Sequence, residues 1–272
     1  MAPITQTRSI VWAALEFIAL IFHCVVREVR MQSGSATLGI LKEVTTIGLF
    51  MLFFYMLSVF MGRGAAIRGD LMMFLLTGVA LFLIHIKAIA STQSASNATS
   101  AEMQHAPMTV ILSILAKAFG GLYLQVVAVS IVVAVLWIFG TDFSIQSPKK
   151  LVLPVFFTWA SGISVGLVIM MLMPVIPGIM KPFSQLYRRA QMITSGKFLP
   201  AAYMPGALIG YFDWNPLFHT IDQARLATFV NYNREVSSMS YPIWFTVVAL
   251  LIGLMGEFWS RKNLSKSKHG NQ

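Results

Sequence analysis

The sequence predicts an all-α polytopic membrane protein with six transmembrane helices, and three observations carry this prediction. Of its 272 residues, 57% are hydrophobic and 11% are charged, whereas soluble domains carry about 25% charged residues. The apolar residues gather in segments near or above the length of about 20 residues that a helix needs to cross the hydrocarbon core. Lysine and arginine flank these segments with the asymmetry that sets membrane topology. We therefore predict one transmembrane domain over residues 1–272.

The net charge of +10 does not point to nucleic acid in this chain. The basic residues stand mostly beside apolar segments, where they act as topology signals and as contacts for anionic lipid. We therefore expect no nucleic-acid partner. The single cysteine, Cys24, excludes an intramolecular disulfide.

The first apolar stretch covers residues 9–26. Glu16 and His23 are seven residues apart and so share one face of a helix. A charge at mid-membrane is costly, and we therefore predict that residues 9–30 form a helix lying in the cytoplasmic interface. A membrane span is the alternative interpretation. Residues 32–43 are short and polar, and they predict a small surface helix suited to contact with a partner.

Six apolar segments follow, and they predict the membrane spans. The spans are expected at about 44–61, 71–90, 109–139, 151–172, 179–198 and 241–258. Residues 91–108 are rich in Ser, Thr, Asn, Gln and Ala, and they predict a polar connection between the second and third spans. The prolines and glycines near 174–178 separate the fourth span from the fifth.

Counting of positive charges supports this topology with both termini in the cytoplasm. Twelve basic residues then lie inside: Arg8, Arg27, Arg30, Lys42, Lys87, Lys181, Arg188, Arg189, Arg261, Lys262, Lys266 and Lys268. Six lie outside: Arg63, Arg68, Lys149, Lys150, Arg225 and Arg234. The two-to-one bias supports a multi-pass protein with six spans and both termini inside.

Prolines and glycines break the apolar segment from Ser195 to Phe229. The breakers are Pro200, Pro205, Gly206 and Gly210. Asn215-Pro216 then has the pattern of a helix start, because Asn caps exposed N–H groups and Pro suits the first helical position. Irregular backbone survives at membrane depth only where protein or a water-filled path covers it. We predict a re-entrant or interfacial hairpin at the mouth of a transport path; a folded external loop with an amphipathic cap is the alternative.

The motifs of enzymes and metal sites are missing from the sequence. One Cys and five scattered His give no zinc-ligand spacing, so we expect no metal. Gly196-Lys197 lacks the Ser or Thr and the earlier Gly of a phosphate loop, so we expect no ATP hydrolysis and no cofactor in this chain. His219 and Asp222 are three residues apart, a spacing that is more often chance than catalysis. We assign no catalytic residue; a membrane-bound glycan enzyme using Asp213 is the remaining alternative.

Four short motifs occur in order along the chain. They are Arg27 to Arg30 with Leu38-Gly39, Phe74 to Gly78, Leu115 to Ala118, and Ser195-Gly196 with Pro205, Asn215 to His219 and Arg225. Together they resemble the motifs of polysaccharide-export ABC permeases of the ABC-2 type, over nearly the whole chain. The chain departs from that family before the first span, where Leu41 to Val44 lacks the usual Trp and acidic-Pro pair.

The resemblance implies a transporter subunit rather than an enzyme. Such permeases form homodimers and bind two copies of a separate ATPase subunit, which holds ATP and Mg²⁺. They move capsular polysaccharide or lipid-linked O-antigen across the bacterial inner membrane, with periplasmic co-polymerase and outer-membrane export proteins as possible further partners. Residues 9–30 would be the interface helix, 32–43 the coupling helix on the ATPase, and 198–230 the re-entrant helices that cap the channel. Candidate coupling residues are Arg30, Ser33, Leu38, Gly39 and Lys42.

A channel for a sugar polymer needs aromatic platforms for ring faces and polar groups that exchange hydrogen bonds. Candidate aromatic channel residues are Phe53, Phe54, Tyr55, Tyr187, Tyr203, Tyr211 and Trp214. Each has a plainer interpretation as a packing or lipid-facing residue. Lys197, Arg188 and Arg189 would attract an acidic polymer, although the two arginines equally serve as topology signals. A lipid or small-molecule exporter of the same type is the alternative function.

Overall fold

The computed structural model describes residues 10–31, 34–60, 71–102, 110–140, 145–198, 201, 204–230, 232 and 236–269. These residues form helices joined by turns and loops. The helices are α1 (Ile10–Met31), α2 (Ala36–Phe60), α3 (Leu71–Glu102), α4 (Val110–Ile138), α5 (Pro148–Leu172), α6 (Pro177–Thr194), α7 (Gly206–Ile209), α8 (Pro216–Thr228) and α9 (Ser240–His269). The predicted all-α class is confirmed for this part of the chain.

Five of the described helices are long and apolar enough to cross a membrane. They are α2, α3 over Leu71–Ala95, α4, α5, and α9 over Ser240–Trp259. These five overlap the predicted spans at 44–61, 71–90, 109–139, 151–172 and 241–258. The predicted span at 179–198 falls mostly on α6, which does not qualify. The reason is composition, since this helix carries Lys181, Arg188 and Arg189 within 18 residues.

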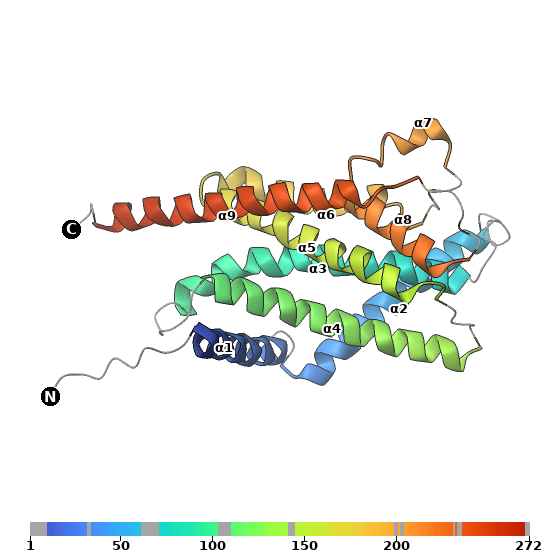
Figure 1. Cartoon of the computed structure of the whole chain (residues 1–272), viewed down its shortest axis with the longest axis horizontal. Helices are drawn as coiled ribbons and strands as arrows, with labels where there is room; N and C mark the ends of the chain where they lie inside the picture. The colour runs from blue at the N-terminus through green and yellow to red at the C-terminus, as the bar shows by residue number, and fades with distance from the viewer. Residues whose placement is uncertain are drawn as a thin grey trace.

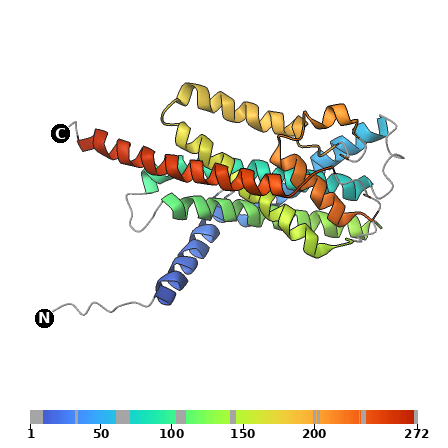
Figure 2. The ribbon, with the colours of Figure 1, turned by 45° about the horizontal axis from the view of Figure 1, so that its top comes forward.

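The long helices form one bundle with two distinct ends. In Figure 1, α3, α4, α5 and α9 run side by side along the long axis, and the start of α1 and the end of α9 lie toward the same end. We call this the terminus end; α3 and α5 also finish there. The opposite end, where α2 and α4 finish and α7 lies, we call the far end. Figure 2 shows α1 leaving the terminus end at an angle to the bundle.

Helix α2 corrects the prediction of a separate helix over 32–43. The chain is one continuous helix from Ala36 to Phe60. The hydroxyls of Thr45 and Thr46 donate to the carbonyls of Leu41 and Lys42, at 2.8 and 2.7 Å. These polar residues are therefore satisfied within the helix, so nothing in the sequence stops it near residue 43.

Helix α3 corrects the prediction of a polar connection from residue 91 in the same way. It continues to Glu102. Ser91 and Thr92 both donate to the carbonyl of Ala88, at 3.2 and 2.8 Å, and Ser94 donates to the carbonyl of Ser91 at 2.8 Å. A run of Ser and Thr therefore extends the helix here because each hydroxyl finds a carbonyl one turn back.

Small residues bring α3 and α5 into close contact. A Cβ atom on Gly162 would lie 2.6 Å from the carbonyl oxygen of His85, and one on Gly166 would lie 2.7 Å from Cβ of Thr92. This Gly-x-x-x-Gly spacing allows the backbones to approach, as in membrane helix pairs generally. His85 is fully buried at the contact, with Nδ1 3.1 Å from the carbonyl oxygen of Thr158. Helix α3 is therefore the central element of the bundle.

Candidate functional site

A tight turn ends α6 and directs the chain toward α8. Ser195 closes the helix in the α conformation, and Gly196 follows with φ +67°, in the left-handed region. A Cβ on Gly196 would also lie 2.6 Å from Cδ2 of Phe218 on α8. Both the dihedral and the lack of space require glycine at this position.

Arg225 on α8 holds this turn from inside the bundle. Its side chain is 1% exposed. Nη1 donates to the carbonyl of Gly196 at 2.9 Å, Nη2 donates to that of Lys197 at 2.5 Å, and the guanidinium lies 3.7 Å from the ring centre of Phe74. Gly78 on α3 leaves room for the contact, since a Cβ there would lie 2.6 Å from the carbonyl oxygen of Lys197. The turn is therefore fixed to both α8 and α3.

The predicted helix start at Asn215-Pro216 is confirmed, and it ties α8 to α6. The Oδ1 atom of Asn215 accepts from the backbone N–H of Leu217 at 3.0 Å, which caps α8. Its Nδ2 donates to Oε1 of Gln191 at 2.7 Å and to Oγ1 of Thr194 at 2.9 Å, both on α6. One buried amide thus fixes the start of α8 against the end of α6.

The motifs found in the sequence meet in pairs. Gly78, Gly196, Asn215 and Arg225, from the second and fourth motifs, all belong to the junction of α3, α6 and α8. The first and third motifs meet near the terminus end, where Oε1 of Glu28 lies 3.7 Å from Nζ of Lys117. Residues of motifs far apart in the sequence therefore lie in contact in the fold.

Lys197 occupies an aromatic cage next to this junction. Its side chain is fully buried, and Nζ lies 3.0 Å from the ring centre of Phe82, 4.7 Å from that of Phe198 and 5.7 Å from that of Phe50. The ring of Phe198 in turn stacks on Phe54, with centres 3.5 Å apart. Within the described part of the chain, the ammonium has no hydrogen-bond partner. We call Phe50, Phe54, Phe82 and Phe198 the lysine cage.

His219 and Asp222 have separate hydrogen-bond partners. Nε2 of His219 lies 2.8 Å from the carbonyl oxygen of Asp213, whereas the carboxylate of Asp222 accepts from the hydroxyls of Tyr232 and Ser237 at 2.5 and 2.6 Å. The Asp222 contacts tie α8 to the segment before α9. No group of three His, Cys, Asp or Glu gathers for a metal ion among the residues that the structure describes.

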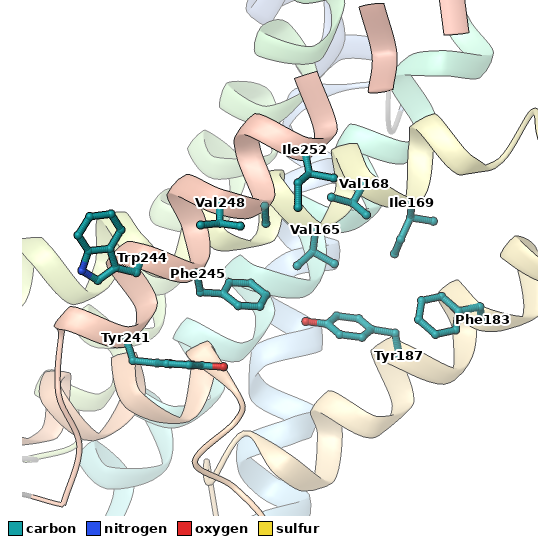
Figure 3. A pocket seen from close by; sticks show the side chains of 11 residues that line it. Val165, Val168, Ile169, Phe183, Tyr187, Tyr241, Trp244, Phe245, Val248 and Ile252 are labelled. Atoms are coloured by element: carbon teal, nitrogen blue, oxygen red, sulfur yellow. The ribbon is translucent and has the colours of Figure 1, made fainter. Parts of the chain in front are cut away.

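An aromatic groove of about 490 Å³ lies between α5, α6 and α9. Figure 3 shows the hydroxyl of Tyr187 pointing across the groove toward Phe245, with Phe183 beside it on α6 and Tyr241 and Trp244 on α9. Of the predicted channel residues that the structure describes, Tyr187 alone lines this groove. Sequence reasoning missed Phe183, Tyr241, Trp244 and Phe245, although a four-residue spacing joins Phe183 to Tyr187 and Tyr241 to Phe245.

The other predicted channel residues do not share one surface. Phe53 is 58% exposed on α2, Phe54 is buried in the lysine cage, and Tyr55 is half-buried. Tyr211 and Trp214 are exposed at the far end, where Nε1 of Trp214 donates to the carbonyl of Tyr211 at 2.9 Å. Tyr203 lies outside the described residues.

The predicted coupling residues lie near the terminus end of α1 and α2. Arg30, Leu38 and Lys42 are exposed, and Gly39 is buried. Ser33 lies outside the described residues. One turn beyond Gly39, the buried carboxylate of Glu43 forms an ion pair with Lys87 on α3. The exposed side chains of Leu38 and Lys42 therefore lie within about one turn of the ion pair that joins α2 to α3.

Comparison with known proteins identifies the family. Two polysialic acid transport proteins KpsM from Escherichia coli are 27% and 26% identical to this chain over 232 residues, covering 84% of this chain and 88% of each relative. Residues 19–229 match the family described as ABC-2 type transporter. This match spans most of the chain and includes all four motifs, so the chain belongs to the ABC-2 type transporter family and is a transport protein rather than an enzyme.

Proposed function

We propose that this chain is the transmembrane permease subunit of an exporter that moves a cell-surface polysaccharide, of the capsular type, across the bacterial inner membrane. The observation that carries the proposal is the similarity to two proteins named for polysialic acid transport, over 84% of this chain.

Helix α6 has the composition of a span that borders a water-filled path. Its buried side carries Met180, Ser184 and Gln191, and Ser184 donates to Oε1 of Gln93 on α3 at 2.9 Å. A second side is polar and exposed, with Lys181, Gln185 and Arg189. A third side is apolar and exposed, with Ile179, Phe183, Leu186 and Ile193.

These three sides suit a helix with protein, water and lipid as its three neighbours. We therefore propose α6 as the sixth span, with its polar side lining the path. The turn at Gly196 supports the proposed re-entrant arrangement of 198–230, because it packs on Gly78, about two turns into α3. A segment at that depth lies within the bundle rather than above it.

The remaining parts of the exporter follow from this orientation. We propose that the terminus end faces the cytoplasm and that α1 is the interface helix. We call the first two turns of α2, around Leu38, Gly39 and Lys42, the base of α2, and we propose that it docks on a separate ATPase subunit. ATP and Mg²⁺ belong to that subunit. The exposed polar side of α6 is one wall of a path, so a second copy of this chain would supply the opposite wall, with two ATPase subunits per dimer.

The test is export in a strain that makes a capsular polymer but lacks its own permease. The chain is expressed with its ATPase subunit, and polymer on the cell surface is measured against polymer retained in the cytoplasm. We expect surface polymer that disappears with an ATPase unable to hydrolyse ATP. Retention of the polymer despite a well-folded, membrane-inserted complex would reject the proposed cargo.

The docking proposal is tested with paired substitutions on α2. Leu38→Asp places a charge on an exposed apolar residue of the proposed docking surface, and Leu57→Asn is the matched change near the other end of the same helix. We expect the first to abolish ATPase co-purification and the second to leave it intact. Equal co-purification of both variants would place the docking surface elsewhere.

A further inference from the structure

Burial of Lys197 in the lysine cage is unfavourable in free energy, and the proposed fold does not require a lysine at this position. A buried ammonium without a charged or hydrogen-bonding partner is strongly disfavoured, and attraction to ring faces returns about 2 kcal/mol when the site is dry. The nearest ring, that of Phe82, accounts for most of that attraction at 3.0 Å. A methionine or leucine would fill the same space at lower cost, so the charge calls for a reason.

Only part of the surroundings of Lys197 is fixed. Its backbone is held by Arg225 and packs on Gly78, so the residue cannot shift without breaking those contacts. Phe50 and Phe54, by contrast, come from α2, whose opposite side is exposed at Leu49, Phe53 and Met56. One side of the cage, formed by Phe50 and Phe54, therefore belongs to a helix with an exposed face, whereas Phe82 stands on α3 and Phe198 directly follows Lys197.

The continuity of α2 connects that cover to the other end of the molecule. Gly39 at the base and Phe54 in the cage stand on the same unbroken helix, about 22 Å apart at 1.5 Å per residue. A displacement of the base of α2 therefore moves the two phenylalanines as well. The sequence analysis predicted two helices, over 32–43 and 44–61, and so did not indicate that the base of α2 and the cage share one helix.

We propose that Lys197 is a concealed cationic contact for acidic sugars of the transported polymer. In the conformation described here the rings of Phe50, Phe82 and Phe198 surround the ammonium. When the base of α2 is displaced, Phe50 and Phe54 withdraw and open one side of the cage, where the ammonium meets a carboxylate of the polymer. The ammonium is then partnered only while cargo is in the path. This inference rests on the proposed export function and adds the substrate class, a carboxylate-bearing polysaccharide.

The first experiment measures stability and export of an acidic capsular polymer in the same variant. Lys197→Met keeps the length of the side chain and removes its charge. We expect the thermal midpoint of the purified complex to rise or stay unchanged, because an unpaired buried cation is lost. Export should fall about tenfold or more, the size of effect expected when a charge-assisted contact is removed. The control, Lys150→Met, changes an exposed cation at the start of α5 and should alter neither quantity.

The second experiment asks whether the position becomes accessible during transport. Lys197→Cys is made together with Cys24→Ala, which removes the natural cysteine. Aminoethyl methanethiosulfonate then restores a side chain with a terminal amine, and the methyl reagent gives a neutral one. We expect reaction only in cells with an active ATPase, and recovery of export with the aminoethyl reagent alone.

The outcomes separate this inference from the proposed function. Export by Lys197→Met at the wild-type level, or a thermal midpoint that falls together with export, would overturn the role of Lys197 while leaving the exporter proposal in place. Equal labelling of the cysteine with active and inactive ATPase would overturn the concealment. Failure of the unmodified chain to export any acidic polymer would instead reject the substrate class, and retention of every polymer tested would reject the proposed function itself.

Discussion

The two ends of the bundle are held together by different kinds of contact. At the junction of α3, α6 and α8, buried groups meet at fixed geometry: Arg225 on two carbonyls, Asn215 on Gln191, and Gly78 and Gly196 where no side chain fits. Toward the terminus end, the contacts of α1 with α4 and of α2 with α3 include ion pairs: Glu28 with Lys117, and the buried Glu43 with the partly exposed Lys87. The first kind of contact tolerates no displacement, whereas the second tolerates small shifts at modest cost.

The difference suggests a fixed region and a movable region in one transporter subunit. The junction forms a rigid base for Lys197 and for the start of α8. The ion pairs hold α1 and α2, which carry the proposed docking residues. The following predictions test this division, beginning with the change of largest expected effect.

Arg225→Leu should be the most damaging substitution in the molecule. It removes two charge-assisted hydrogen bonds and leaves the buried carbonyls of Gly196 and Lys197 without donors, a loss of about 3–5 kcal/mol. Arg225→Lys should also fail, because an ammonium cannot reproduce the two-pronged geometry or the stacking on Phe74. The measurement is the fraction of monodisperse protein after solubilisation, with Lys150→Met as the exposed control. A yield of Arg225→Lys equal to wild type would show that charge alone suffices.

Gly196→Ala should destabilise the same junction by a smaller amount, about 1–3 kcal/mol. The alanine meets both an unfavourable positive φ and the ring of Phe218. The matched control is Gly206→Ala, where an added Cβ meets no atom within 4 Å. If the ring contact contributes, adding Phe218→Leu should make the loss less than additive in a double-mutant cycle of thermal midpoints. Strict additivity would assign the whole effect to the dihedral.

Much of the far end was predictable from the sequence because its signals are local. Asn215-Pro216 predicts a helix start from two adjacent residues, and the structure confirms the cap. The five helices that are long and apolar enough to span a membrane follow from hydropathy alone. The partners of Arg225 were not predictable, since they stand 28 and 29 residues earlier in the chain and contribute backbone carbonyls, which carry no signature in the sequence.

The wrong predictions concerned where two helices begin or end. Polar runs at 32–43 and 91–108 indicated surface segments, but in α2 and α3 the Thr and Ser side chains bond to carbonyls of their own helix. A hydroxyl that satisfies itself locally is compatible with a loop and with a helix, so composition does not decide between them. The sequence analysis named Lys197 as a candidate channel residue, but its enclosure depends on rings from α2 and α3 that only the fold brings together.

Glu43→Gln tests the movable region at its stronger ion pair. The carboxylate is buried and its partner Lys87 is partly exposed, so loss of the pair should cost about 1–3 kcal/mol. Because α2 would be less firmly held to α3, we also expect ATP hydrolysis to continue with reduced export per ATP. The combination of Glu43→Gln with Lys87→Met should be less damaging than the sum of the two. Unchanged export per ATP in the single variant would argue against a moving α2.

Glu28→Gln should have the smallest effect of the series. Its oxygen lies 3.7 Å from Nζ of Lys117, a longer separation than in a tight ion pair, and such partly exposed pairs contribute about 0.2–1 kcal/mol. The substitution should therefore lower the thermal midpoint only slightly. The difference from wild type should disappear at high ionic strength, where salt screens the pair. A matched measurement of Gly120→Leu, which pushes a side chain into the space beside Glu28, should cost more, because α1 would then be displaced from α4. If the charge change instead proved more harmful than the displacement, α1 would belong to the fixed region, and the boundary between the two regions would have to be moved to α2.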